Sequence, residues 1–279
     1  KIISNSITKN TVGVKVGLAS ERKSQETSSV KTLGDRNKQC VSDHNSEQDR
    51  EEQVKRDNLS FLQEVFGKAE IKKNISIVGN QLNGVLIEGE NNRSVVLNNH
   101  LVGFNGEAGV KVEREAFAVV SNNKVYKNYR EGVLVFRIAV YNRKELDFIQ
   151  HRGNVALGGH NSHHSSVIDN LIADSPGTGL YLIKTGKVKV IRNDICDNQD
   201  GMILTHSQPE IQRNHIHQNK NNGIVCEHHS QPTIIENFIT RNNGVGLLFR
   251  QSSGKKNSTI HSNILVSNEI DTGVQEFDK

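Results

Sequence analysis

The sequence predicts an all-β protein: a right-handed, single-stranded parallel β-helix of about ten coils, each of roughly 23 residues, with one long disordered insertion. Three observations support this prediction. A short phrase built on Asn recurs at a nearly constant spacing, a Gly followed by aliphatic residues recurs beside it, and only 34% of the 279 residues are apolar. So low an apolar content suits a solenoid, whose core is a thin column.

The recurring phrase has a leading Asn, an aliphatic residue two positions later and usually a second Asn or Ser three positions beyond that. A Gly followed by an aliphatic residue comes next. The leading residues of the clearest copies are Asn170, Asn193, Asn214, Asn237 and Asn263, which are separated by 23, 21, 23 and 26 positions. Self-similarity at this period is typical of repeat architectures, in which each unit stacks on its neighbours.

Each part of the phrase has a physical role in a coil. Aliphatic residues at alternate positions, as in Val133 and Val135, indicate short strands with one face inward. The preceding Gly is expected to supply a positive φ at a corner. The Asn is expected at another corner, with left-handed backbone angles and an amide that bonds to the Asn of the coils above and below. We therefore expect the ladder Asn residues to be structural.

A long interruption follows the first coil, residues 5–16. Segment 18–67 is rich in Ser, Gln, Lys, Glu and Asp, so we expect a disordered loop inserted into a single domain that spans residues 1–279. Near the end of this loop, Leu59, Leu62 and Phe66 would share one face of a short helix. That face either packs on the side of the solenoid or docks a partner.

Some later coils depart from the phrase. Ile75 stands where a leading Asn is expected, and Phe104 stands where a second Asn is expected. From Asn123 to Asn170 is 47 positions, or two periods, which predicts a hidden coil between them. Residues 147–152 fall at the expected point, with Asp147 in place of the Asn, and complete the set of about ten coils.

Charge and cysteine content narrow the class of protein. The 35 basic and 31 acidic side chains give a net charge of +4, and no run of Lys and Arg with interleaved aromatics indicates a nucleic-acid surface. No apolar run approaches the ~18 residues that a membrane span needs. Cys40, Cys196 and Cys226 are an odd number without a CxxC pair. Free thiols in a reducing compartment are therefore expected, which favours a cytoplasmic, or else nuclear, location.

Histidines mark the clearest anomalies in the turns. The phrase His-Ser-Gln-Pro begins at His206 and again at His229, one coil apart. With coils ~4.8 Å apart, these side chains should stack along one edge, with His228 beside them and with His163 and His164 in the corresponding turn two coils earlier. Three interpretations stay open: a solvent-exposed turn, a recognition patch for a protein partner, or a zinc cluster.

The carboxylates do not form the constellation that β-helix hydrolases and lyases need. Such enzymes gather acidic side chains with a basic residue on one face, whereas the Asp residues of this chain flank ladder Asn residues or lie in turns. We therefore predict no catalytic residue, no cofactor and no metal. His215 and His217 flank an inward Ile and should be surface residues. The alternative is a carbohydrate-binding or carbohydrate-active β-helix, for which Tyr126 and Tyr129 are among the few aromatics able to stack on sugars.

Segments 211–224 and 231–237, with their Asn-x-Ile-x-x-Asn and Gly-Ile phrases, resemble known parallel β-helix repeats. These are the repeats of pectin-lyase-like, carbohydrate-binding and sugar-hydrolase domains, and the likeness is nearest to the intracellular β-helix F-box only proteins. The resemblance implies a non-catalytic protein-recognition solenoid, the substrate-recognition part of a Skp1–cullin–F-box ubiquitin ligase whose F-box lies outside these residues. The implied partners are a protein substrate and the Skp1–cullin complex. The residues expected to contact the substrate are His163, His164, His206, His228, His229, Leu59, Leu62 and Phe66.

Overall fold

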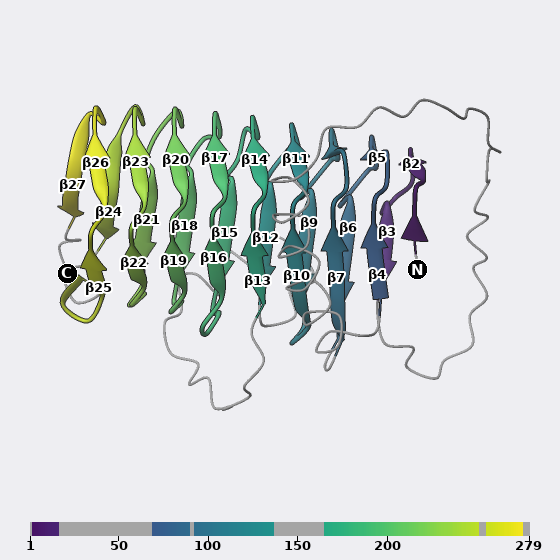
Figure 1. Ribbon diagram of the computed structural model, residues 1–279, viewed down its shortest axis with the longest axis horizontal. Coiled ribbons are helices and arrows are strands. Elements are labelled where there is room, and N and C mark those ends of the chain that lie inside the picture. Colours follow the sequence, from purple (N-terminus) through teal and green to yellow (C-terminus); the bar gives the residue numbers. More distant parts are fainter. Residues whose placement is uncertain (1, 17–68, 90–91, 137–164, 251–254, 276–279) are drawn as a thin grey trace, which may run out of the picture.

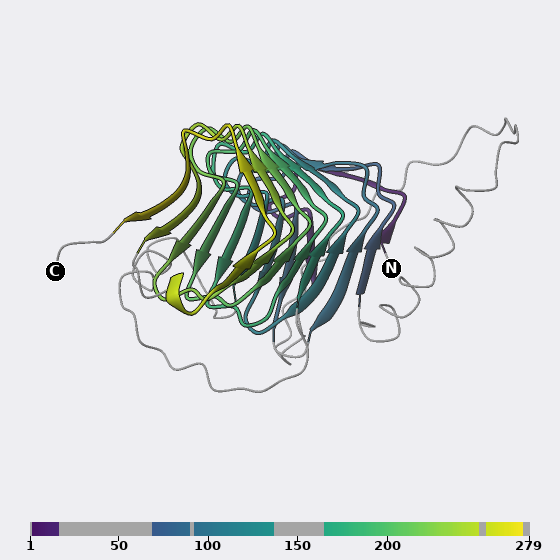
Figure 2. The ribbon, with the colours of Figure 1, turned by 60° about the vertical axis from the view of Figure 1, so that its left-hand side comes forward.

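The computed structural model describes residues 2–16, 69–89, 92–136, 165–250 and 255–275. Within these ranges the chain forms three parallel sheets of nine strands each, and every coil contributes one strand to each sheet. The coils stack in chain order from one end of the molecule to the other (Figure 1), and a turned view shows that successive coils follow the same path (Figure 2). The predicted parallel β-helix is confirmed.

The three sheets run the whole length of the stack. Sheet A contains β1 (Ile2–Ile3), β4 (Ala69–Lys72), β7 (Arg93–Leu97), β10 (Phe117–Ser121), β13 (Ser166–Ile168), β16 (Lys189–Ile191), β19 (Glu210–Gln212), β22 (Thr233–Ile235) and β25 (Thr259–His261). Sheet B contains β2 (Ser6–Thr8), β5 (Ser76–Val78), β8 (Val102–Gly103), β11 (Lys124–Tyr126), β14 (Leu171–Ala173), β17 (Asp194–Cys196), β20 (His215–His217), β23 (Phe238–Thr240) and β26 (Ile264–Val266). Sheet C contains β3 (Val14–Val16), β6 (Val85–Glu88), β9 (Val110–Glu113), β12 (Val133–Phe136), β15 (Leu180–Ile183), β18 (Met202–Thr205), β21 (Ile224–Glu227), β24 (Val245–Arg250) and β27 (Ile270–Gln275).

Aliphatic side chains in register fill the interior of the solenoid. In sheet B, Ile172, Ile195, Ile216 and Ile239 lie opposite one another on consecutive strands and are fully buried. Their neighbours along each strand point outward, because side chains alternate between the two faces of a sheet. The core is therefore a narrow column, and the outer faces of the sheets and turns are where the coils differ.

The Asn ladder holds the corner between sheets A and B. The Nδ2 of Asn170 donates to Oδ1 of Asn193 at 3.0 Å, and Asn193 donates in the same way to Asn214 at 3.0 Å. The left-handed backbone angle, however, belongs to the residue before the ladder Asn, as at Asp169 (φ 56°) and Arg192 (φ 53°). The predicted structural role is confirmed, but the prediction that the Asn itself takes the left-handed angles is wrong.

The repeated Gly also acts differently from the prediction. Among the described glycines only Gly79 and Gly89 have a positive φ. Gly179 is required for space instead: a Cβ there would lie 2.8 Å from the carbonyl oxygen of Gly201 and 2.7 Å from Nδ2 of Asn198. Because the glycines of successive coils approach one another in this way, any side chain would push the coils apart.

The stack holds nine coils, one fewer than the predicted count of about ten. Asn123 donates to Asn170 directly, from its backbone N at 2.9 Å and from Nδ2 at 3.0 Å. Strand β11 pairs with β14, and β12 pairs with β15, so no coil lies between them. The hidden coil predicted at Asp147 is therefore wrong. The 47-residue spacing includes residues 137–164, which lie outside the described ranges.

The two departures from the phrase predicted at Ile75 and Phe104 do not exist, because the sequence was aligned one residue out of register at both places. Asn74, not Ile75, is the ladder residue of its coil, and its Nδ2 donates to Oδ1 of Asn99 at 2.8 Å. Likewise Asn105, next to Phe104, donates to Oδ1 of Asn128 at 2.9 Å. Shifting a chain by one residue moves its side chains to the other face. Phe104 therefore points outward.

The predicted insertion at residues 18–67, with Leu59, Leu62 and Phe66, lies outside the described residues, and the single-domain boundaries stay a prediction. Within the described part of the chain, no helix has the length and apolar character needed to cross a membrane.

Candidate functional site

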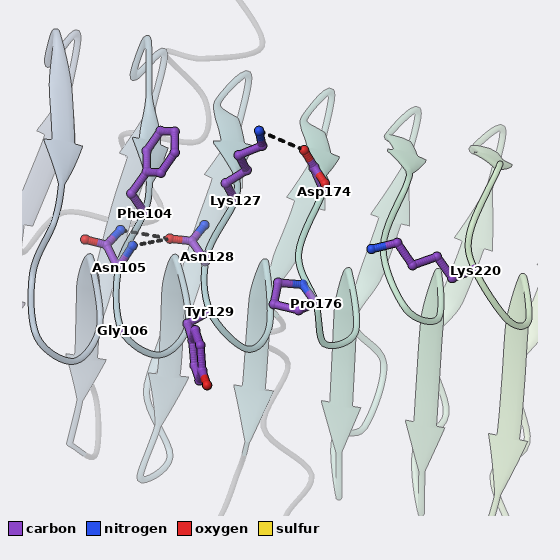
Figure 3. Close-up of a pocket in the computed structure, with 9 residues that line it drawn as sticks. All are labelled: Phe104, Asn105, Gly106, Lys127, Asn128, Tyr129, Asp174, Pro176 and Lys220. Carbon is purple, nitrogen blue, oxygen red and sulfur yellow. Dashed lines mark hydrogen bonds and ion pairs between the residues drawn. The ribbon is translucent and has the colours of Figure 1, made fainter.

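A pocket of about 430 Å³ lies on the outside of the turns that follow sheet B. Its lining residues, drawn in Figure 3, come from three consecutive coils and, for Lys220, from the next coil but one: Phe104, Asn105, Gly106, Lys127, Asn128, Tyr129, Asp174, Pro176 and Lys220. We call it the turn pocket. Its volume falls within the range of about 300–1,000 Å³ that small-molecule sites occupy.

The backbone of the ladder explains why these side chains gather. The residue before the second ladder Asn takes a positive φ and points outward, which places Phe104, Lys127 and Asp174 in one column. The residue after it forms a second column, in which Tyr129 and Lys220 lie on either side of Pro176 along the stack. The sequence pattern singled out Tyr129 only as a possible sugar platform. Reading the positions on either side of each second Asn would have found the rest.

Exposed aromatic side chains are concentrated at this pocket. Phe104 is 54% exposed and Tyr129 is 70% exposed, and Phe238 is the only other aromatic among the exposed large hydrophobic residues that the structure describes. Phe104 also packs edge-on against Tyr126, with ring centroids 6.1 Å apart. Large apolar rings left in solvent favour a binding role, since burying them against a ligand is favourable.

The charge of the turn pocket is positive on balance. Lys127 Nζ lies 3.3 Å from Asp174 Oδ2 and 5.1 Å from the centroid of the Tyr126 ring. Hydrogen bonds to Tyr126 and Asp174 raise the pKa of Lys127, so its ammonium group is fully charged at neutral pH. Lys220 adds a second cation at the other end of the pocket, where Figure 3 shows its side chain reaching toward the neighbouring coil.

The structure brings His206, His228 and His229 together, but in a different pairing from the one predicted. Thr205 lies opposite Glu227, so the next residues in register are His206 and His228, whose rings stack 5.3 Å apart. His229 is an extra residue in its turn and meets His206 edge-on at 6.3 Å. The repeated phrase aligned the wrong histidine because it ignored this inserted residue. His163 and His164 lie outside the described residues.

His206 directly follows β18 in the turn after sheet C, beside His228 and His229. Both of its ring nitrogens are buried and lack a hydrogen-bond partner among the described residues. Burial, followed by the charges of His228, Lys184 and His229, lowers the pKa of His206 to about 4. Burial also lowers the pKa of Lys184. His206 therefore offers no accessible ring nitrogen for a hydrogen bond, and its role in recognition stays a prediction.

A second group of histidines lies on the outer face of sheet B. His215 and His217 of β20 flank the inward Ile216, as predicted, and Asp194 of β17 lies opposite His215. The donor atoms of these three side chains all lie within 4.8 Å of one another. The sequence pattern presented both histidines as plain surface residues. The missed signal was an acidic residue one repeat earlier, in register with a His-x-His strand.

Both cysteines in the described ranges are free and buried, as expected from their spacing. Burial raises the pKa of Cys196 to about 12 and raises the pKa of Cys226 as well. Protonated, inaccessible thiols resist oxidation in any compartment, because the thiolate is the reactive form. The free thiols of Cys196 and Cys226 are therefore no evidence for a reducing compartment.

Comparison with known families defines the class: the chain is a right-handed parallel β-helix protein. The family model described as a right-handed beta helix region matches residues 138–265, and the family model described as periplasmic copper-binding protein (NosD) matches residues 3–200. The second match covers more than half of the chain. The chain therefore belongs to the NosD family of β-helix proteins. No curated protein gives a match.

The family corrects the expected location. Its description is of a periplasmic protein, so the prediction of a cytoplasmic or nuclear location is wrong, and an extracellular or periplasmic location is indicated. The prediction rested in part on Cys196 and Cys226, whose thiols are buried and therefore protected from oxidation in any compartment. The comparisons support a pectin-lyase-like β-helix repeat. They do not include an F-box protein among the families matched, so the narrower F-box resemblance stays a prediction.

The comparison with solved structures gives two epimerase modules, of which the first is similar in fold. The A-module of mannuronan C-5 epimerase AlgE4 from Azotobacter vinelandii is 21% identical with a TM-score of 0.50, over 74% of this chain and 54% of that chain. The A-module of mannuronan C-5 epimerase AlgE6 from the same organism is 17% identical with a TM-score of 0.37, over 75% of this chain and 54% of that chain. The chain thus spans about half the length of these structures, and the likeness concerns the fold alone.

Proposed function

We propose that this chain is a non-catalytic binding solenoid whose turn pocket holds an extended, negatively charged glycan. The observation that carries the proposal is the pair of exposed rings, Phe104 and Tyr129, set among the cations Lys127 and Lys220. Flat aromatic faces suit the apolar faces of sugar rings, and ammonium groups suit carboxylate or sulfate substituents.

The shape of the pocket supports a ligand that runs along the solenoid. Phe104, Lys127, Asp174 and Lys220 belong to successive coils with one coil between the last two, and coils are ~4.8 Å apart. The lining therefore extends over roughly 19 Å. A single sugar would touch only one ring or one cation, whereas an oligosaccharide parallel to the axis would contact both rings and both cations.

The proposal is for binding without catalysis. Asp174 is the one carboxylate among the residues that line the turn pocket, and it is paired with Lys127 at 3.3 Å. Acid–base cleavage of a glycan needs two positioned groups with different protonation states. An ion-paired carboxylate beside a fully protonated lysine suits charge recognition better.

The similar AlgE4 module belongs to a mannuronan C-5 epimerase, which suggests a mannuronate oligomer as the first probe. The experiment is a calorimetric titration of the full chain with a mannuronate hexamer, beside a neutral hexasaccharide. We expect saturable binding of the acidic oligomer alone, weakening as salt rises because the contacts are ionic.

Tyr129→Ala and Lys220→Gln should each weaken binding about tenfold, which corresponds to ~1.4 kcal/mol. The matched controls are Phe238→Ala, an exposed aromatic outside the turn pocket, and Lys189→Gln, an exposed lysine on sheet A. An equal loss of affinity in the pocket variants and in the two controls would contradict the proposal that the glycan binds in the turn pocket.

Recognition of a protein is the competing function, since the same cations could bind an acidic peptide. Binding of a poly-glutamate peptide and not of the mannuronate oligomer, lost in Tyr129→Ala, would replace the glycan with a protein partner. A ubiquitin-ligase role is not part of the proposal, because the indicated location conflicts with it.

A further inference from the structure

The side chains of Asp194, His215 and His217 converge on the outer face of sheet B. His215 and His217 project from the same side of β20, and their rings stack with centroids 3.9 Å apart. Asp194 Oδ1 lies 2.8 Å from His217 Nε2 and 3.6 Å from His215 Nδ1. A single oxygen of the carboxylate therefore faces one nitrogen of each imidazole.

These distances suit a metal ion at the centre of the three atoms. Ligand bonds to Zn²⁺ from His nitrogen and carboxylate oxygen are about 2.0–2.2 Å, so neighbouring ligands of a tetrahedral site lie roughly 3.4 Å apart. The separation of His215 and Asp194 already has this value, within a few tenths of an ångström. The shorter contact to His217 would need to open by about half an ångström, which a rotation of the half-exposed Asp194 side chain allows.

The contact of the other His217 ring nitrogen is compatible with a metal site. Nδ1 of His217 lies 2.8 Å from Oε1 of Gln218, an acceptor that suits the tautomer with the proton on Nδ1. In the neutral ring Nε2 is then an acceptor, yet it faces the Asp194 carboxylate, another acceptor, at 2.8 Å. In that tautomer the nitrogen and the carboxylate oxygen are both acceptors, and a metal ion between them would accept an electron pair from each. A metal-bound His commonly donates its other ring N–H to a neighbouring acceptor, and this hydrogen bond holds the ring in place.

We propose that Asp194, His215 and His217 form a site for a late first-row divalent metal ion, with Cu²⁺ bound more tightly than Zn²⁺. Two imidazoles and a carboxylate suit both ions, and affinities in such sites rise toward copper. Solvent would complete the coordination, because the side chains of Asp194 and His215 are 51% and 43% exposed. Phe238 stacks on His215 at 5.1 Å and closes one side of the site.

This inference is independent of the glycan proposal, because the metal site and the turn pocket share no residue. The family description speaks of copper without indicating where it binds. Among the residues that the structure describes, this group alone brings three His, Cys, Asp or Glu donors within 4.8 Å of one another.

The test is a competition titration of the full chain with CuCl₂ and, separately, with ZnCl₂, each against a chromophoric chelator. We expect one equivalent of Cu²⁺ and an electron paramagnetic resonance spectrum with coupling to two nitrogens. His217→Gln and Asp194→Asn should each weaken Cu²⁺ binding at least tenfold, with an unchanged far-UV circular dichroism spectrum.

The matched controls are His261→Gln, an exposed histidine on sheet A, and Cys40→Ser. Both should leave the affinity unchanged. A second histidine cluster makes the test specific: if His206→Gln weakened binding and His217→Gln did not, the assignment would be wrong. Non-saturable uptake of Cu²⁺, or tighter binding of Zn²⁺ than of Cu²⁺, would also overturn the proposal.

Discussion

The inner and outer sides of the same turn behave as two different regions. On the inner side, Asn105 and Asn128 are buried and bond to one another, and the same residue type returns in nearly every coil. On the outer side, the adjacent positions hold Phe104, Lys127 and Asp174, which share no chemistry. The inner position is fixed because its side chain must accept a hydrogen bond from one neighbouring coil and donate one to the other. The outer position is free to vary, and it carries the candidate function.

The largest expected effect is on the inner side. Asn193→Ala removes the acceptor of the Asn170 backbone N–H at 3.0 Å and the donor to the carbonyl oxygen of Val167 at 2.8 Å. Leaving buried polar groups unpaired should lower the free energy of unfolding by about 3 kcal/mol or more. Urea denaturation would measure this loss. Asn221→Ala, at an exposed turn position, is the control and should stay within about 0.5 kcal/mol of the wild type. Equal losses of stability in Asn193→Ala and Asn221→Ala would contradict the claim that the inner position matters more than the outer one.

A second prediction concerns glycine, which a coil can require either for lack of space or for a positive φ. Gly179→Ala places a Cβ 2.8 Å from the carbonyl oxygen of Gly201 and should destabilise the protein by about 2–3 kcal/mol, because the coils must separate. Gly79→Ala meets nothing within 4 Å and suffers only its positive φ of 66°, at roughly 1 kcal/mol. Thermal unfolding of both variants would rank them. The reverse ranking would mean that backbone angle, and not space, fixes the repeated glycine.

The smallest effect comes from His206, a turn residue whose two ring nitrogens are buried. Its folded-state pKa of about 4 lies below the ordinary histidine pKa of 6.5, so only the unfolded chain takes up a proton between these values. Stability is therefore unaffected above the higher value and falls as pH is lowered through the interval. With solvent screening included, the loss at pH 5 should be about 1–2 kcal/mol. His206→Gln should lose less stability between pH 7 and pH 5 than the wild type, as measured by unfolding temperature.

Much of the fold could be predicted from the sequence because the inner positions repeat. The Asn phrase predicted parallel stacking and the buried Ile column, both of which are confirmed. The predicted number of coils was too high by the one placed at Asp147, because a spacing of two periods looks the same whether a coil or an inserted segment fills it. Asn74 and Asn105 were missed by one residue, because their coils carry an extra residue between the two ladder positions.

The candidate sites were harder to predict, since they depend on register between coils. The turn pocket appears only when Phe104 is placed outward, which the one-residue error prevented. The group of Asp194, His215 and His217 depends on pairing β17 with β20. His228 replaced His229 as the partner of His206 because one turn holds an inserted residue. In each case the residue types were visible in the sequence, and their alignment across coils was not.

The most direct test of the central claim is to map a bound mannuronate hexamer by backbone amide chemical shifts on the isotope-labelled full chain. The outer side of the sheet B turns should respond most, at Phe104, Lys127, Tyr129 and Lys220. Amides of the outer side of sheet C, around His206 and Glu227, should remain unchanged. The largest shifts on sheet C, or no shift in the turn pocket at saturating ligand, would contradict the account.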